Sequence, residues 1–75
     1  MTERRAVPPW RKVAADLRRR VEAGEWPPGA LLPSLSALSI EYGVSQSTAR
    51  KAIGSLVEAG LAETVPGWGT FVAEK

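Results

Sequence analysis

The stretch Tyr42–Ile53, with the sequence YGVSQSTARKAI, decides the fold of this chain. Glycine often ends a helix in the left-handed conformation, and serine is a preferred residue just before the first turn of a helix. The stretch therefore predicts a short helix that ends at Gly43, a tight turn, and a second helix that begins after Ser45. Two helices joined this closely form a helix-turn-helix, whose second helix enters the major groove of DNA.

The helix after Ser45 has two different faces. At 100° per residue, one arc collects the apolar residues that we expect to face the core: Ala49, Ala52, Ile53, Leu56 and Val57. The opposite arc is short, polar and cationic, with two polar residues flanking its start: Ser47, Arg50, Lys51 and Gly54, flanked by Gln46 and Thr48. Glutamine can pair with adenine and arginine with guanine, while serine and threonine serve bases or phosphates. This arc is thus a candidate DNA-reading surface, on which Gly54 either admits a close approach or is merely tolerated.

A longer amphipathic helix is predicted upstream. A Pro-Pro pair at 8–9 marks its start, because proline is tolerated where a helix leaves the backbone N–H without a partner. Between residues 10 and 23 the apolar residues recur at spacings of three and four: Trp10, Val13, Ala14, Leu17 and Val21. We interpret Arg18–Arg20 as a solvated face rather than as phosphate contacts. Gly24 is expected to end the helix.

The segment between this helix and the helix-turn-helix is rich in proline and glycine and predicts a rigid loop. We expect Trp26 to be a buried anchor of this loop rather than a ligand-stacking surface. Residues 30–32 are compatible with one short strand. Ser34 is expected to cap the next helix, whose inward-facing residues would be Leu35, Leu38 and Ile40.

A β-hairpin is predicted after the recognition helix, which Gly60 ends. Residues 61–65 and 69–73 carry Val, Thr and Phe, which favour strands, around the turn Pro66–Gly69. A hairpin at this place is a wing, and its glycines would admit phosphates closely. A hairpin that only covers the core is the alternative. The predicted fold class is mainly α with a small antiparallel β-hairpin, a winged helix-turn-helix of three helices plus wing over residues 8–75, preceded by a flexible N-terminal arm at residues 1–7.

Composition excludes most catalytic chemistry. The 75 residues contain no cysteine and no histidine, so a Ser-His or Cys-His nucleophile and a thiolate metal site are impossible. The 8 carboxylates are scattered singly, and we expect no enzyme, no cofactor and no metal. No apolar run is long enough to span a bilayer, which favours a cytoplasmic protein. The net charge of +2 is compatible with nucleic acid without requiring it.

Short motifs follow one another along the chain in a fixed order. They are Leu32-Pro33-Ser34, Tyr42-Gly43-Val44-Ser45, Ala49-Arg50-Lys51-Ala52, Glu58-Ala59-Gly60-Leu61 and Gly67-Trp68-Gly69-Thr70-Phe71-Val72, preceded by residues 13–17 and 24–29. In this order and spacing they resemble the GntR family of bacterial transcription regulators over residues 8 to 73. The resemblance implies a winged helix-turn-helix that binds palindromic operators as a dimer.

The resemblance also implies roles for single residues. Gln46, Ser47, Thr48 and Arg50 match the contact positions of the family's recognition helix, and Gly67 matches the wing-tip glycine that enters the minor groove. To these we add serines at the starts of the two helices, Lys51 beside Arg50, and the wing-turn residues after Gly67. The candidate DNA-binding residues are then Ser34, Ser36, Ser45, Gln46, Ser47, Thr48, Arg50, Lys51, Gly67, Trp68, Gly69 and Thr70.

The chain departs from the family pattern at several of these places. Leu35 and Ser36 stand where family members usually carry a Glu-Arg pair, and Gln46 replaces the common arginine after the turn serine. Two cationic contacts are thus lost, each of which would release counterions on binding, so we expect weaker or less salt-dependent affinity. The wing tip is apolar, and we expect Trp68 to pack against a neighbour (Val57 or Phe71) or to stiffen the wing.

Taken together, these features predict a sequence-specific DNA-binding transcription regulator, a repressor, with recognition helix 46–59 in the major groove and wing 61–73 beside it. The expected partner is double-stranded DNA in the nucleoid, bound by a weak homodimer on a palindromic operator, with no membrane. GntR regulators continue into a larger effector-binding domain, whereas this sequence stops at Lys75. If it is the whole gene product, we expect no small-molecule effector site in it; otherwise it is an excised domain. The alternative is a winged-helix protein-interaction module that acts as partner of a larger regulator.

Overall fold

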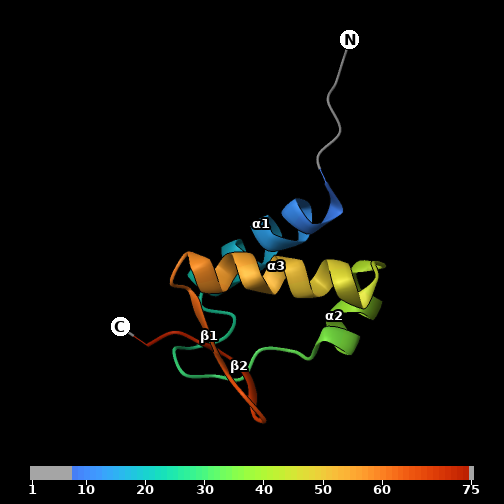
Figure 1. Cartoon of the computed structure of the whole chain (residues 1–75). Helices are drawn as coiled ribbons and strands as arrows, with labels where there is room; N and C mark the ends of the chain where they lie inside the picture. The colour runs from blue at the N-terminus through green and yellow to red at the C-terminus, as the bar shows by residue number, and fades with distance from the viewer. Residues whose placement is uncertain (1–7, 75) are drawn as a thin grey trace.

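The computed structural model describes residues 8–74 and contains three helices followed by a two-stranded antiparallel sheet (Figure 1). The elements are α1 (Pro9–Glu22), α2 (Leu35–Tyr42), α3 (Gln46–Glu58), β1 (Ala62–Val65) and β2 (Gly69–Val72). This order confirms the predicted winged helix-turn-helix. The arm predicted at residues 1–7 lies outside the described residues.

Helix α1 begins one residue earlier than predicted and ends one residue earlier. Its predicted stripe faces inward, with Val13, Ala14 and Leu17 buried and the two outer members, Trp10 and Val21, packed against the core. In Figure 1, α1 lies along one side of α3, and the hairpin projects from the other side. The three helices therefore form the body from which the wing extends.

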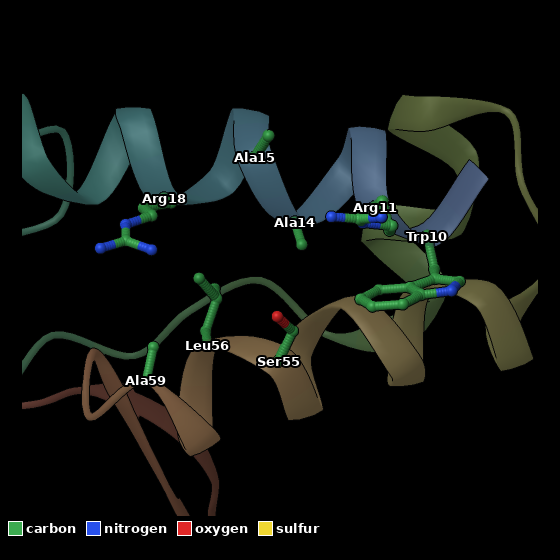
Figure 2. A pocket seen from close by; sticks show the side chains of 8 residues that line it. All are labelled: Trp10, Arg11, Ala14, Ala15, Arg18, Ser55, Leu56 and Ala59. Carbon is green, nitrogen blue, oxygen red and sulfur yellow. The ribbon is translucent and has the colours of Figure 1, made fainter. Parts of the chain in front are cut away.

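Helices α1 and α3 approach each other along a groove in which small side chains alternate with longer ones such as Trp10 and Arg18 (Figure 2). Ala14 of α1 and Leu56 of α3 point toward each other across it, and Ser55 and Ala59 add little bulk on the α3 side. Small residues allow two helices to pack closely, because no long side chain holds their backbones apart. This packing fixes the orientation of α3, whose other face carries the predicted contact residues.

The helix-turn-helix forms as its cap residues predict. Ser34 Oγ accepts a hydrogen bond from the backbone N–H of Ala37 at 3.1 Å and so caps α2. Gly43 ends that helix with φ at +66°, in the left-handed region that glycine adopts readily. The hydroxyl of Ser39 then donates to the carbonyl oxygen of Val44 at 2.5 Å, which holds the turn closed.

The prediction that Ile40 of α2 faces the core is wrong. Leu38 has no exposed surface and Leu35 packs against the core, but Ile40 is 82% exposed. A residue two positions beyond Leu38 points to nearly the opposite side of an α-helix, since each residue turns by about 100°. Because α2 is short, the burial of Leu38 determines which face of the helix turns toward the core, and Ile40 lies on the other face.

The wing is a short hairpin with a register that runs from Ala62↔Val72 to Val65↔Gly69. Its turn is closed by the N–H of Trp68, which donates to the Val65 carbonyl at 2.9 Å. Proline at the second turn position and Gly67, with φ at +82°, at the third are typical of a type II turn. The loop before α2 runs along the outer edge of β2, but it forms a single bridge at Leu31 rather than the predicted strand over residues 30–32.

Candidate nucleic-acid interface

The exposed face of α3 carries the polar arc that the sequence predicts. Four members of the apolar arc are buried: Ala49, Ala52, Ile53 and Leu56. The polar arc is exposed: Gln46, Ser47, Arg50, Lys51 and Gly54. A Cβ atom added to Gly54 would meet no atom within 4 Å, so packing within the protein does not demand glycine there. The arc is therefore a free surface, low enough at Gly54 for another molecule to approach the backbone.

The two cations of this arc have different surroundings. Within residues 8–74 no carboxylate forms an ion pair with Arg50, whose guanidinium is available for an anion or a base edge. Lys51 instead reaches back toward α1, where its Nζ atom lies 5.5 Å from the centroid of the Trp10 ring. Such a cation–π contact is weak at an exposed site, so Lys51 can leave it for a phosphate at little cost.

The start of α3 uses two predicted contact residues for its own cap. Ser45 Oγ accepts from the backbone N–H of Thr48 and donates to Thr48 Oγ1, both at 3.1 Å. The cap satisfies one of the backbone donors that every helix leaves open at its N-terminus. These two hydroxyls are therefore engaged within the protein, whereas Ser47 between them is exposed.

Gln46 and Ser36 contact each other across the helix-turn-helix. Gln46 Nε2 donates a hydrogen bond to Ser36 Oγ, with 2.9 Å between the two atoms, and both residues are exposed. Gln46 is the first residue of α3 and Ser36 the second of α2, so the bond joins the N-terminal ends of the two helices. Sequence reasoning named both residues but not their contact, because nothing local links positions ten residues apart.

The wing and the start of α2 enclose a second part of the candidate surface. A groove there is lined by Ser34, by Ile53 of α3 and by wing residues 64–70. It brings Ser34 together with Gly67, Gly69 and Thr70, all of which the sequence predicts as contacts. The structure therefore gathers the predicted residues into two neighbouring groups, one on α2 and α3 and one along this groove.

The wing tip is exposed and apolar. Trp68 is 75% exposed, so the expectation that it packs against Val57 or Phe71 is wrong. Trp68 lies in the turn between the last strand partners, Val65 and Gly69, and lines the grooves on the wing. Val65 of the wing and Leu31 of the loop beside β2 are also exposed, so Trp68 has exposed apolar residues on neighbouring segments.

Arg20 is the centre of a polar network that holds α2 against α1. Its guanidinium donates to both carboxylate oxygens of Glu25 at 3.0 and 2.6 Å, to Glu41 at 2.9 Å and to the Tyr42 hydroxyl at 2.7 Å. It also lies 4.4 Å from the centroid of the partly buried Trp26 ring, which anchors the loop. Only 15% of the arginine side chain is exposed, so its interpretation as part of a solvated face is wrong.

The network shifts the protonation of its members. The Tyr42 hydroxyl donates to Asp16 Oδ2 at 2.5 Å, and this bond, with another from Arg19, lowers the pKa of Asp16. Hydrogen bonds from Arg20 lower the pKa of Glu25. Burial, together with the bond to Asp16, raises the pKa of Tyr42 to about 12. Both carboxylates are thus ionised and the phenol neutral at neutral pH, which is the arrangement the hydrogen bonds require.

A comparison with protein families identifies the chain. The model of the family described as "Bacterial regulatory proteins, gntR family" matches residues 9–72, which is most of the chain. The chain belongs to the gntR family. Within this GntR-family domain, the resemblance drawn from the short motifs is confirmed.

Several curated relatives of this GntR-family chain are named as repressors. The chain is 43% identical over 68 residues to the mannosyl-D-glycerate transport/metabolism system repressor MngR of Escherichia coli, and 37% identical over 68 residues to the histidine utilization repressor of Pseudomonas putida. The match covers 91% of this chain in both comparisons, but 28% and 27% of the two relatives. The chain thus spans about a quarter of the length of these relatives.

Solved structures of similar domains contain DNA. The AraR DNA-binding domain in complex with operator ORR3 superposes with a TM-score of 0.89 at 36% identity, covering 97% of this chain and 88% of that one. The complex of the same domain with operator ORE1 gives the same TM-score and identity. Among residues 8–74 of this chain, no group of acidic side chains is placed to hold a metal ion, and no helix is long and apolar enough to cross a membrane.

Proposed function

We propose that this GntR-family chain is a sequence-specific DNA-binding transcription regulator, a repressor, which places α3 in the major groove. One observation carries the proposal: the exposed face of α3 presents Gln46, Ser47 and Arg50 side by side, while its apolar residues are buried. These are the side chains that read base edges through hydrogen bonds. The repressors among its relatives and the operator complexes of the AraR domain support the same role.

The wing lies beside α3 in this proposal and contacts the backbone or the minor groove. The turn at Gly67 and the groove between Ser34 and Thr70 present backbone groups and small side chains, which can approach phosphates closely. Trp68 is the exposed aromatic residue of the wing turn, where it can pack against sugars or wedge into the minor groove. We extend the proposal to a weak homodimer on a palindromic operator, acting in the nucleoid without a cofactor, enzymatic activity or an effector site in these residues.

Selection of duplexes from a random DNA pool tests the proposal. The protein should enrich one sequence and bind it at least about tenfold more tightly than random duplex at the same salt concentration. Affinity for random duplex should fall between about 50 mM and about 200 mM salt, because cationic contacts release counterions. Failure to enrich any sequence, with no salt-sensitive binding to random duplex, would rule the proposal out.

The homodimer has its own test. Sedimentation of the free protein at micromolar concentration, and of its complex with the selected duplex, measures how many copies are bound. We expect mostly monomer in the free protein and two copies on a palindromic duplex, since two-fold operators match two-fold protein symmetry. If only one copy binds a palindromic duplex at saturating protein concentration, the homodimer is contradicted. Recognition of a single half-site by one copy would still be possible.

The exposed Trp68 favours a second candidate function, a protein-interaction module that partners a larger regulator. Tryptophan is enriched among the residues that dominate protein interfaces, and here it is accompanied by exposed Leu31 and Val65. A module of this kind should not be retained on random duplex DNA in a salt-sensitive manner. The salt series described above therefore separates the two candidates.

A further inference from the structure

Two predicted contact residues, Ser36 and Gln46, are joined by a hydrogen bond on the exposed face of the helix-turn-helix. Gln46 Nε2 donates to Ser36 Oγ across 2.9 Å, between the first turn of α3 and the first turn of α2. Neither residue is buried, so the bond does not serve to satisfy a polar group in the core. It restrains a side chain that would otherwise be free to rotate on the surface.

We propose that Ser36 and Gln46 act as one unit that reads an adenine in the major groove. Gln46 contacts the base, and Ser36 is a positioning residue that holds the carboxamide in place. This inference rests on the proposed function and specifies which base one part of α3 recognises. Neither side chain is ionised, so the unit would recognise the base through the orientation of its hydrogen-bonding groups.

The chemistry of the carboxamide favours adenine. Adenine presents an N6 amino donor and an N7 acceptor in the major groove, which match the Oε1 atom of glutamine and the N–H group beside it. The second N–H of the amide points away from that edge, and one N–H is all that the bond to Ser36 requires. The base-pairing edge of Gln46 can therefore stay free while the other side of the amide is held.

Guanine fits the same edge poorly. It presents two acceptors, O6 and N7, so Oε1 of the held amide would face an oxygen instead of a donor. A side chain that is free to rotate could turn its nitrogen toward O6, but the bond to Ser36 opposes this rotation. The expected preference for adenine over the other bases is about 5- to 100-fold, the range of a good bidentate contact.

The test uses the duplex selected by the parent protein. Each adenine is replaced in turn by 7-deaza-adenine, which lacks N7, or by purine, which lacks the N6 amino group. At one adenine per half-site, both analogues should weaken binding by the parent about 5- to 100-fold and leave binding by Gln46→Ala nearly unchanged. Gln46→Arg should shift the preference at that position to guanine.

Ser36→Ala distinguishes positioning from folding. It should lose part of the adenine preference at the same position, while the slope of affinity against salt stays that of the parent, because no charge is removed. Ser55→Ala is the matched control, since Ser55 lies in the groove between α1 and α3 and no predicted contact residue is involved there (Figure 2). Circular dichroism confirms that each variant is folded.

Some outcomes would overturn the adenine-reading unit alone, and another would overturn the proposed function as well. If a sequence is enriched but no adenine analogue distinguishes the parent from Gln46→Ala, the protein reads DNA without this unit. The same conclusion follows if Ser36→Ala keeps the full adenine preference, because the serine then positions nothing. If no sequence is enriched at all, the proposed function fails together with the inference.

Discussion

Arg20 of α1 donates a hydrogen bond of 2.7 Å to the hydroxyl of Tyr42, the last residue of α2. The two residues are 22 positions apart, and the same guanidinium also holds Glu25 in the loop between the helices. The bond places the helix-turn-helix against α1 at the end of α2, just before the turn at Gly43. The position of the candidate DNA surface therefore depends on a contact outside that surface.

Replacing Arg20 by alanine should destabilise the fold. The side chain is mostly buried and removing it leaves Glu25, Glu41 and the phenol without their donor, so we expect a loss of roughly 1–3 kcal/mol in the free energy of unfolding. The matched control is Arg18→Ala, whose exposed pair with Glu22 contributes at most about 0.5 kcal/mol. Urea unfolding of both variants measures the difference, and equal losses would contradict the role of Arg20.

The same network should make the free energy of unfolding depend on pH in both the acid and the alkaline range. The pKa values of Asp16 and Glu25 are lowered in the folded protein, so the unfolded chain binds more protons as acid is added. This part of the stability is present above the ordinary carboxyl range and is lost as pH falls through and below about pH 4. The raised pKa of Tyr42 acts in the opposite direction, and stability should fall as pH rises from 10.0 toward about 12.

Tyr42→Phe is the control for this pH dependence. Phenylalanine has no phenol to ionise, so the alkaline loss assigned to Tyr42 should disappear. The acid loss should become smaller, because the hydrogen bond that most lowers the pKa of Asp16 is gone. Urea unfolding measured across the pH series reports both limbs, and an alkaline limb unchanged in Tyr42→Phe would show that other groups cause it.

Local signals in the sequence were sufficient for the helices and the turn. Ser34, Ser45 and Gly43 act within one helical turn of their own positions, so their chemistry alone indicates where α2 and α3 begin and where α2 ends. The buried and exposed arcs of α3 follow from helical periodicity in the same way. The wing strands differ from their predicted bounds by one residue at their outer ends.

Contacts between distant segments could not be predicted in this way. The partners of Arg20 on α2 are 21 and 22 residues away, and a run of three arginines gives no sign that one of them turns inward. The bond between Gln46 and Ser36 depends on how α2 crosses α3. The sequence predicts that Trp68 packs against a neighbour or stiffens the wing, but it lies in the turn between Val65 and Gly69 with its side chain 75% exposed. The DNA contacts of the candidate residues stay predictions.

Gly54→Ala should stabilise α3 while testing whether DNA approaches the helix at this position. Alanine is favoured over glycine in a helix interior by about 1 kcal/mol, and its Cβ would meet no atom of the protein within 4 Å. We therefore expect a gain of roughly 0.5–1 kcal/mol in the free energy of unfolding. Binding of the selected duplex should become weaker if DNA passes close to this glycine. A variant that is more stable and binds equally well would show that Gly54 is merely tolerated.

Trp68→Ala should affect binding but not folding. The side chain is 75% exposed, so its removal should change the free energy of unfolding by no more than about 0.5 kcal/mol. Affinity for the selected duplex should fall, because the wing loses its exposed aromatic contact. Ile40→Ala, which removes another exposed apolar side chain, is the control on α2. Unchanged duplex affinity in Trp68→Ala would favour the tryptophan as a contact for another protein.

The affinity of Arg50→Ala for the selected duplex tests most directly whether α3 reads DNA. We predict a loss of about 1–3 kcal/mol in binding free energy and weaker discrimination against random duplex, because Arg50 lies on the exposed arc and forms no ion pair within residues 8–74. Arg18→Ala removes the same charge from α1 and should bind nearly as the parent does. An Arg50→Ala/Lys51→Ala protein that bound the duplex as tightly as the parent would contradict the docking of α3 in the major groove.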